Sequence, residues 1–188
     1  DRVAADYGRD FFLFIGVWRY YKGLHILLKA MQGSSSRVVV VGSGPIEARI
    51  RSRAARMGLD NVEFPGRVDD STKVALLRLC RAVVLPSHLR SEAFGMTLLE
   101  SAMYSKPMIC AEVGSGTSYI NVDGETGLVV APNSPAALSE AMDYLRDNPE
   151  KSRVMGEKAR QRFLENFTGD IMGASYRDIY RRVLANNT

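Results

Sequence analysis

The chain has few of the residues that hold metals or act as nucleophiles. Among 188 residues there are two cysteines and two histidines. Cys80 and Cys110 stand beside apolar residues without histidines at ligand spacing, which predicts buried thiols from a reducing compartment and no zinc site. His25 falls in a helical pattern, and we interpret it as structural. His88 follows an apolar run, where we expect a solvent-facing loop residue, with a ligand contact as the alternative.

Long apolar segments are also absent. No run approaches the roughly 20 residues that a membrane-spanning helix needs. The first residues are polar and show no signal peptide, so we expect a cytoplasmic protein, or one at the inner face of the membrane. The chain does not begin with Met, so we expect a fragment, and its length predicts one domain over 1–188. The net charge of +4 suits phosphate-bearing ligands or an anionic membrane surface, and we expect no nucleic-acid partner.

Six short apolar runs predict buried strands. They do not alternate cleanly with polar residues, which is typical of parallel strands covered on both faces. Helical patterns lie between most of them, and this order predicts an α/β fold with a doubly wound, Rossmann-like parallel sheet. The predicted strands are 11–15, 38–41, 62–64, 82–85, 107–110 and 128–130.

Capping residues predict where several helices begin or end. Either Asp69 or Asp70 is placed to cap a helix that begins near Thr72. Ser134 followed by Pro135 predicts the start of another helix. Two charged helices are expected at the C-terminal end, over about 150–165 and 170–186.

Two carboxylates, Glu92 and Glu100, bracket seven residues after the fourth apolar run. We expect a helix over 94–104, whose first-turn amides could hold an anion. From Phe94 to Glu100 such a helix rises roughly 9 Å. A carboxylate at each end could accept hydroxyl hydrogen bonds while the amides between them hold phosphates.

This segment resembles the E-x7-E motif of retaining glycosyltransferases with the GT-B fold, sequence family 4. Other motifs of that family follow in the same order along nearly the whole chain. The resemblance identifies the chain as one half of a GT-B fold, the C-terminal donor domain, with the acceptor-binding N-terminal domain absent. The matching segments are 14–23 (first strand and phosphate loop), 41–45 (second glycine turn), 61–68 (third strand and base-side loop) and 124–130 (last strand).

The resemblance also implies roles along the diphosphate and sugar. Glu92 would hold the sugar hydroxyls. Arg19 and Lys22 would neutralise the leaving diphosphate, as two cations after the first strand could in a doubly wound sheet. The helix start would add backbone contacts to the donor. It comprises Phe94, Gly95 and Met96.

On the nucleoside side, the resemblance places Glu100 at the ribose and the backbone of Val68 at the base. Gly16 and Gly42 would let the backbone approach the nucleotide. Asp70, together with Lys73, would lie near the base edge, where a carboxylate suits the N–H donors of guanine. Mg²⁺ binding by paired acids is the alternative at 69–70. We favour capping or base readout there, and we expect no metal and no cofactor besides the donor.

The chain departs from the family pattern at two positions. Val17 stands where the family usually has an arginine, and Arg19 lies two residues later. Ser118 stands where the family often has a glutamate. The segments 19–23 and 114–119 look more like a subgroup that contains mannosyltransferases, which favours GDP-mannose as donor.

The expected function is retaining transfer of a hexose, mannose from GDP-mannose by preference, to an acceptor sugar or lipid-linked glycan. The full enzyme could associate peripherally with a membrane, and this chain alone is expected to be inactive. A nucleotide-sugar epimerase or a phosphorylase on the same fold is one alternative. A nucleotide-sugar-binding module without catalysis is the other, because of Val17 and Ser118.

Overall fold

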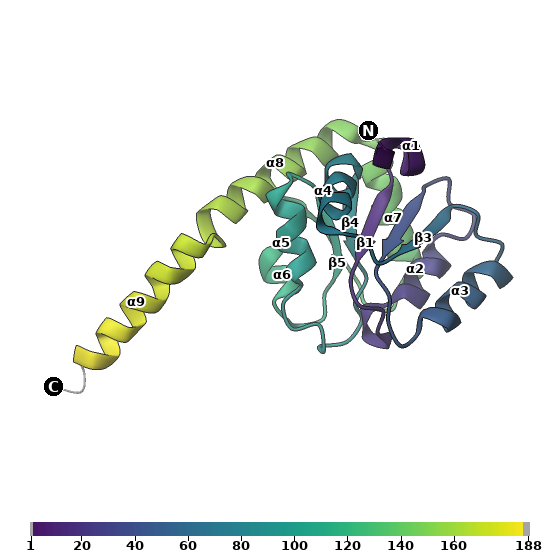
Figure 1. Cartoon of the computed structure of the whole chain (residues 1–188). Coiled ribbons are helices and arrows are strands. Elements are labelled where there is room, and N and C mark those ends of the chain that lie inside the picture. The colour runs from purple at the N-terminus through teal and green to yellow at the C-terminus, as the bar shows by residue number, and fades with distance from the viewer. Residues whose placement is uncertain (1, 186–188) are drawn as a thin grey trace.

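The structure is a computed structural model that describes residues 2–185. Six parallel strands form one sheet in the order β3-β2-β1-β4-β5-β6, with helices packed around it (Figure 1). The predicted doubly wound α/β fold is therefore confirmed, and each expected strand is present within two residues of its predicted ends. The strands are β1 Phe12–Ile15, β2 Val38–Val41, β3 Val62–Gly66, β4 Ala82–Leu85, β5 Met108–Ala111 and β6 Gly127–Val130.

The central strands are buried on both faces. Phe12 and Phe14 of β1 pack in one apolar cluster, whereas Leu13 packs in a second one. Successive side chains of a strand point to opposite faces, so the two clusters lie on opposite sides of β1. This explains why β1 reads as a continuous apolar run.

Helices connect the strands, and most follow the predicted pattern. Asp69 caps α4, its carboxylate accepting a hydrogen bond from the Thr72 amide at 2.7 Å, and Ser134 caps α7. Three short elements were not expected from the sequence: α1, η1 and α6. The elements up to α7 are α1 Arg2–Tyr7, η1 Tyr20–Lys22, α2 Leu24–Ala30, α3 Glu47–Arg56, α4 Asp70–Leu79, α5 Met96–Met103, α6 Thr117–Ile120 and α7 Pro135–Asp147.

The order of the strands reverses between β1 and β4, which are neighbours in the sheet although two strands separate them in the chain. In open α/β sheets, ligands bind in the crevice outside the carboxyl ends of the strands at such a reversal. The loops after β1, β2, β3 and β4 therefore frame the expected site.

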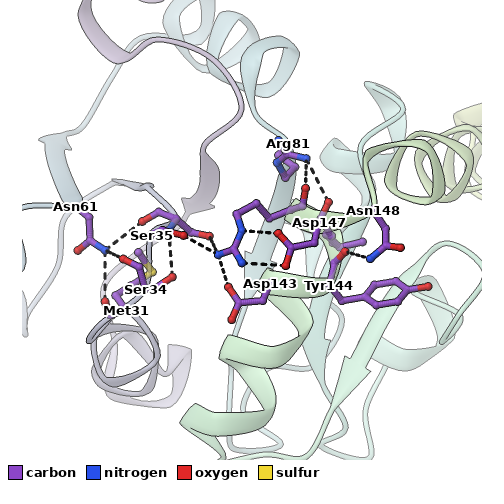
Figure 2. A network of polar contacts seen from close by, with 12 residues as sticks. Met31, Ser34, Ser35, Asn61, Arg81, Asp143, Tyr144, Asp147 and Asn148 are labelled. Carbon is purple, nitrogen blue, oxygen red and sulfur yellow. Dashed lines mark hydrogen bonds and ion pairs between the residues drawn. The ribbon is translucent and has the colours of Figure 1, made fainter.

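The amino end of the sheet is tied together by polar contacts (Figure 2). The side-chain amide of Asn61 donates to three backbone carbonyls of the loop after α2. Arg146 of α7 contacts the Ser35 hydroxyl of that loop at 2.9 Å and pairs with Asp143 and Asp147. Arg81 donates to the last carbonyls of α7. These contacts join separate connections to the sheet at the end opposite the crevice.

Two helices close the described chain, α8 (Pro149–Asn166) and α9 (Gly169–Ala185), close to the predicted bounds; residue 186 lies outside the described residues. Helix α9 extends away from the sheet and buries none of its residues (Figure 1). None of the helices within residues 2–185 is long and apolar enough to cross a membrane.

Both cysteines are buried and free, as predicted. Burial raises the pKa of the Cys80 thiol to about 12, and that of Cys110 likewise to about 12. Both thiols are therefore protonated at neutral pH, which suits a packing role.

Candidate functional site

A buried ion pair lies at the crevice between β1 and β4. The ammonium of Lys22, from the loop after β1, contacts Oε2 of Glu92, from the loop after β4. The Ser87 hydroxyl donates to the same oxygen at 2.8 Å. The side chains of Lys22 and Glu92 are only 12% and 8% exposed. The sequence prediction named the lysine and the glutamate but gave them separate ligands, and it missed Ser87.

A glycine makes this pairing possible. Gly23 has a left-handed backbone (φ 74°), and an added Cβ would lie 1.9 Å from the Pro86 carbonyl oxygen. The two loops also share a backbone hydrogen bond of 2.9 Å from the amide of His88 to the carbonyl of Tyr21. The Lys22-Gly23 sequence thus brings the lysine against the loop that carries Glu92.

A second close approach joins the loops after β1 and β2. Gly42 has φ 117°, and an added Cβ would lie 2.0 Å from the Gly16 carbonyl oxygen. Beside them lies a cavity of about 320 Å³. Four residues predicted to bind the donor line it: Gly16, Gly42, Val68 and Asp70. Its other lining residues are Ile15, Val17, Val41, Ser43, Arg67 and Lys73.

Lys73 connects the base side of the cavity to Glu100. Its ammonium lies 3.2 Å from a Glu100 oxygen and 3.4 Å from an Asp70 oxygen. Glu100, and then Asp70, raise the pKa of Lys73, so this cation stays charged. Asp69 caps α4, which settles which of the two acids forms the cap. The Asp70 side chain is 97% exposed and lies beside Lys73 at the edge of the cavity.

The start of α5 lies between Glu92 and Glu100 along the chain. The expected helix is present, but it begins at Met96, two residues after the approximate start expected at Phe94, because Gly95 is left-handed (φ 91°) and forms its N-cap. Phe94 and Met96 are both exposed. The Thr97 hydroxyl donates to the Ile15 carbonyl at 3.2 Å, which ties the helix start to the carboxyl end of β1. From Met96 to Glu100 the helix rises about 6 Å.

The other candidate residues are less enclosed. Arg19 is exposed, and among the described residues its side chain makes no hydrogen bond or ion pair. Ser118 lies in α6. No group of three or more acidic, histidine or cysteine side chains within residues 2–185 is placed to hold a metal ion.

The prediction that His88 is a solvent-facing loop residue was wrong. It is 7% exposed, and both of its ring nitrogens are buried without a hydrogen-bond partner. Its ring packs at right angles to Tyr20 and His25, with centroid distances of 4.9 Å to each. The burial of His88 could not be predicted, because it depends on the close packing of the β1 and β4 loops, which local sequence does not reveal.

The packing of His25 and His88 predicts that the folded state loses stability in acid. Burial lowers the pKa of His25 to about 4, with further lowering by His88, Arg53, Lys29 and Arg49. Burial also lowers the pKa of His88. Both folded-state pKa values lie below the unfolded value of about 6.5, so the unfolded chain binds more protons as the pH falls. The histidines should therefore contribute a loss of stability from about pH 6.5 downward, and the His25 contribution should level off near pH 4.

Urea unfolding of the wild type and of His25→Gln between pH 7 and pH 5 checks this prediction. The variant should show the smaller fall in the free energy of unfolding. Equal falls for the two proteins would show that His25 is not responsible.

Comparison with known proteins shows the family of this chain. Residues 2–162 match the family described as glycosyl transferases group 1. The chain is 60% identical over 161 residues to the D-rhamnosyltransferase WbpZ of Pseudomonas aeruginosa, covering 86% of this chain and 42% of that protein. It is 51% identical over 181 residues to the O-antigen chain mannosyltransferase C of Escherichia coli, covering 96% of this chain and 49% of that protein. The chain spans less than half the length of these two relatives.

Solved structures share the fold. A sucrose-phosphate synthase from Thermosynechococcus elongatus aligns with a TM-score of 0.86 at 25% identity, over 98% of this chain and 49% of that one. Anabaena Alr3699/HepE, solved with UDP and glucose, aligns with a TM-score of 0.86 at 18% identity, over 96% and 51%. The C-terminal domain of a group 1 protein, LpcC of Francisella tularensis, aligns with a TM-score of 0.76 at 21% identity, over 89% and 92%. From the family match and the two close relatives, the chain belongs to the group 1 glycosyltransferases.

Proposed function

We propose that this chain is the donor-binding domain of a retaining glycosyltransferase and binds a nucleotide-sugar along the carboxyl ends of β1 to β4. One observation carries the proposal: two lysine–glutamate pairs, Lys22–Glu92 and Lys73–Glu100, come from loops and helices around the same crevice. The start of α5 lies between the two glutamates in the chain. This arrangement offers cations and amides for a diphosphate, with a carboxylate on each side for hydroxyl groups.

In this proposal each group has one partner on the donor. Lys22 and the first-turn amides of α5 neutralise the diphosphate as the glycosidic bond breaks, and Arg19 adds a second cation from its exposed position. Glu92 accepts hydrogen bonds from the sugar hydroxyls. Glu100 accepts those of the ribose. The protein's contribution is positioning and charge stabilisation, with same-face attack at the anomeric carbon and no protein nucleophile.

The ammonium of Lys22 can serve both Glu92 and the donor. It contacts the Glu92 carboxylate, and an ammonium has three hydrogens to donate. A bound diphosphate can take one of them while Glu92 keeps another. Metal independence remains part of the proposal, because these cations and the helix start supply positive charge where the phosphates would lie.

We further propose that the natural enzyme has a second, acceptor-binding domain. The chain covers 42% and 49% of the two relatives, so a protein of their length has room for one. Helix α9 supports this, because one side of it carries exposed apolar residues that no described element covers. They are Met172, Tyr176, Ile179, Tyr180, Val183 and Leu184. The full enzyme would act in the cytoplasm. If its acceptor is a lipid-linked glycan, the enzyme would contact the inner face of the membrane.

The donor we propose is GDP-mannose, and the acceptor a growing surface polysaccharide. The support is twofold: the relatives are named as a D-rhamnosyltransferase and an O-antigen chain mannosyltransferase, and Asp70 lines the base side of the cavity. A carboxylate there can accept from the two N–H donors of guanine, which uracil does not offer together.

The domain should therefore bind GDP more tightly than UDP. Losing one hydrogen bond to an ionised group costs about 1.5–3 kcal/mol, which corresponds to at least tenfold in affinity. Competition calorimetry with the two nucleotides measures the difference, and Asp70→Asn should reduce it. A preference for UDP in the wild-type domain would overturn both the guanine and the mannose proposals.

Glu100→Gln should weaken GDP binding by about tenfold, because a neutral amide oxygen replaces the charged acceptor proposed for the ribose hydroxyls. Isothermal titration of the isolated domain measures this. The matched control is Glu140→Gln, an exposed glutamate of α7, which should bind GDP like the wild type. Equal affinities for wild type and Glu100→Gln would remove Glu100 from the nucleoside site.

The two alternative functions make different predictions. An epimerase would change the sugar of the donor, and a phosphorylase would need phosphate as co-substrate. A binding module without catalysis would hold the nucleotide-sugar unchanged. Product analysis of the full-length protein with GDP-mannose and an acceptor glycan separates these from transfer, which yields GDP and an extended glycan.

A further inference from the structure

The hydrogen bonds of Glu92 are unevenly shared between its two oxygens. Lys22 and Ser87 both donate to Oε2. Oε1 accepts no hydrogen bond from the rest of residues 2–185, and it is not among the buried atoms without a partner. This oxygen therefore remains open to solvent in an otherwise buried side chain.

Ser87 is well placed to maintain this arrangement. It is 1% exposed and follows Pro86 directly at the carboxyl end of β4. The backbone of Pro86 is packed against Gly23. This packing fixes the position of the Ser87 hydroxyl relative to the loop that carries Lys22. The hydroxyl is five residues from Glu92 and closes the loop that carries it.

From these contacts we infer that Ser87 is a positioning residue for the transfer reaction: it holds Oε2 of Glu92 so that Oε1 accepts the hydroxyl of the donor sugar. This inference rests on the function proposed above. In the proposed complex Lys22 shares its ammonium between Glu92 and the diphosphate, whereas the Ser87 hydroxyl serves Glu92 alone. Ser87 is the second protein donor to Oε2, and it carries no charge that a phosphate would attract.

The inference is tested in the full-length enzyme with a double-mutant cycle of Ser87→Ala and Glu92→Ala. Ser87→Ala alone should lower the turnover rate about tenfold, as expected for one hydrogen bond to an ionised group. Its affinity for GDP should change by less than about twofold, because the hydroxyl does not touch the nucleotide. In the Glu92→Ala background, Ser87→Ala should have no further effect on turnover.

A matched control separates positioning from a general loss of packing. Ser101 is also fully buried, lies near the C-terminal end of α5, and donates one hydrogen bond to the Lys106 carbonyl at 3.0 Å. Ser101→Ala should leave turnover unchanged at temperatures where the protein is folded. Ser87→Cys, which keeps the volume but donates weakly, replaces Ser87→Ala if the alanine variant does not fold, and should lower turnover similarly.

The outcomes distinguish the inference from the proposed function. Suppose that the wild-type enzyme transfers sugar. If Ser87→Ala is then equally active, or if it lowers turnover by the same factor with Glu92 present and with Glu92→Ala, the inference about Ser87 is overturned and the proposed function is not. A wild-type enzyme that binds no nucleotide and transfers no sugar overturns the proposed function, and the inference with it.

Discussion

Lys22→Ala should lower the affinity of the domain for GDP by at least tenfold. A charge-assisted hydrogen bond to phosphate is among the stronger polar interactions, and the lysine lies in a site that excludes most solvent. Raising the ionic strength should weaken wild-type binding, because the contact is between opposite charges. Titration calorimetry of the isolated domain at two salt concentrations measures both effects.

The alanine variant also leaves Glu92 buried without its cation, which destabilises the fold. Lys22→Gln is therefore made in parallel, because the amide still donates to Glu92 while the charge is lost. The control is Lys29→Ala, an exposed lysine of α2. The same titrations with Mg²⁺ and with EDTA test metal independence. Binding that EDTA abolishes and Lys22→Ala preserves would assign Asp69 and Asp70 to a metal and misplace the phosphate site.

Glu92→Gln should lower turnover and spare GDP affinity, in contrast to Lys22→Ala. Turnover of the full-length enzyme should fall by about a hundredfold, comparable with the loss of a group that stabilises the transition state. GDP affinity should be unchanged or higher, because Lys22 loses its carboxylate and the diphosphate becomes its only anionic partner. Steady-state transfer kinetics and calorimetry on the same preparations measure the two quantities.

Glu63→Gln is the control, since Glu63 also pairs with a cation, Arg37, but does so on β3. It should retain both turnover and GDP affinity. A Glu92→Gln enzyme with full turnover would contradict the proposed contact to the sugar. Loss of GDP affinity in parallel with turnover would show that Glu92 supports nucleotide binding through its pairing with Lys22 rather than acting on the sugar alone.

The sheet was predictable because its information is local. The valine run of β2 and the apolar run of β4 are strands with the predicted bounds, and buried parallel strands leave such unbroken runs. Helix caps such as Ser134 were equally readable, since the capping side chain lies next to the helix in the sequence. The spacing of Glu92 and Glu100 along the chain is local as well.

The contacts within the site were not predictable, because they join distant segments. Lys22 and Glu92 are 70 residues apart, and the sequence gives no signal that they pair. The burial of His88 depends on the same packing of two loops. One signal could have been used: Ser87 is a polar residue directly after a buried strand, at the sheet edge where ligands bind.

The start of α5 shows a third limit. Phe94 fits a helical pattern, but Gly95 takes a left-handed conformation that packs it against Leu85 and Thr117. A glycine within an apolar pattern is compatible with both a helix interior and a cap, and tertiary packing decided between them. The first backbone amides of the helix therefore belong to Met96 and its neighbours, and these are the amides that the proposed function assigns to the diphosphate.

In the proposed function the nucleotide-sugar lies at the carboxyl ends of the strands, with the diphosphate beside Lys22 and the ribose beside Glu100. A crystal structure of the domain with GDP tests it most directly. We expect a phosphate oxygen within hydrogen-bond distance of Lys22 and the ribose hydroxyls within hydrogen-bond distance of Glu100. GDP bound instead in the hollow between Gly124, Tyr144 and Lys158, away from this crevice, would contradict it.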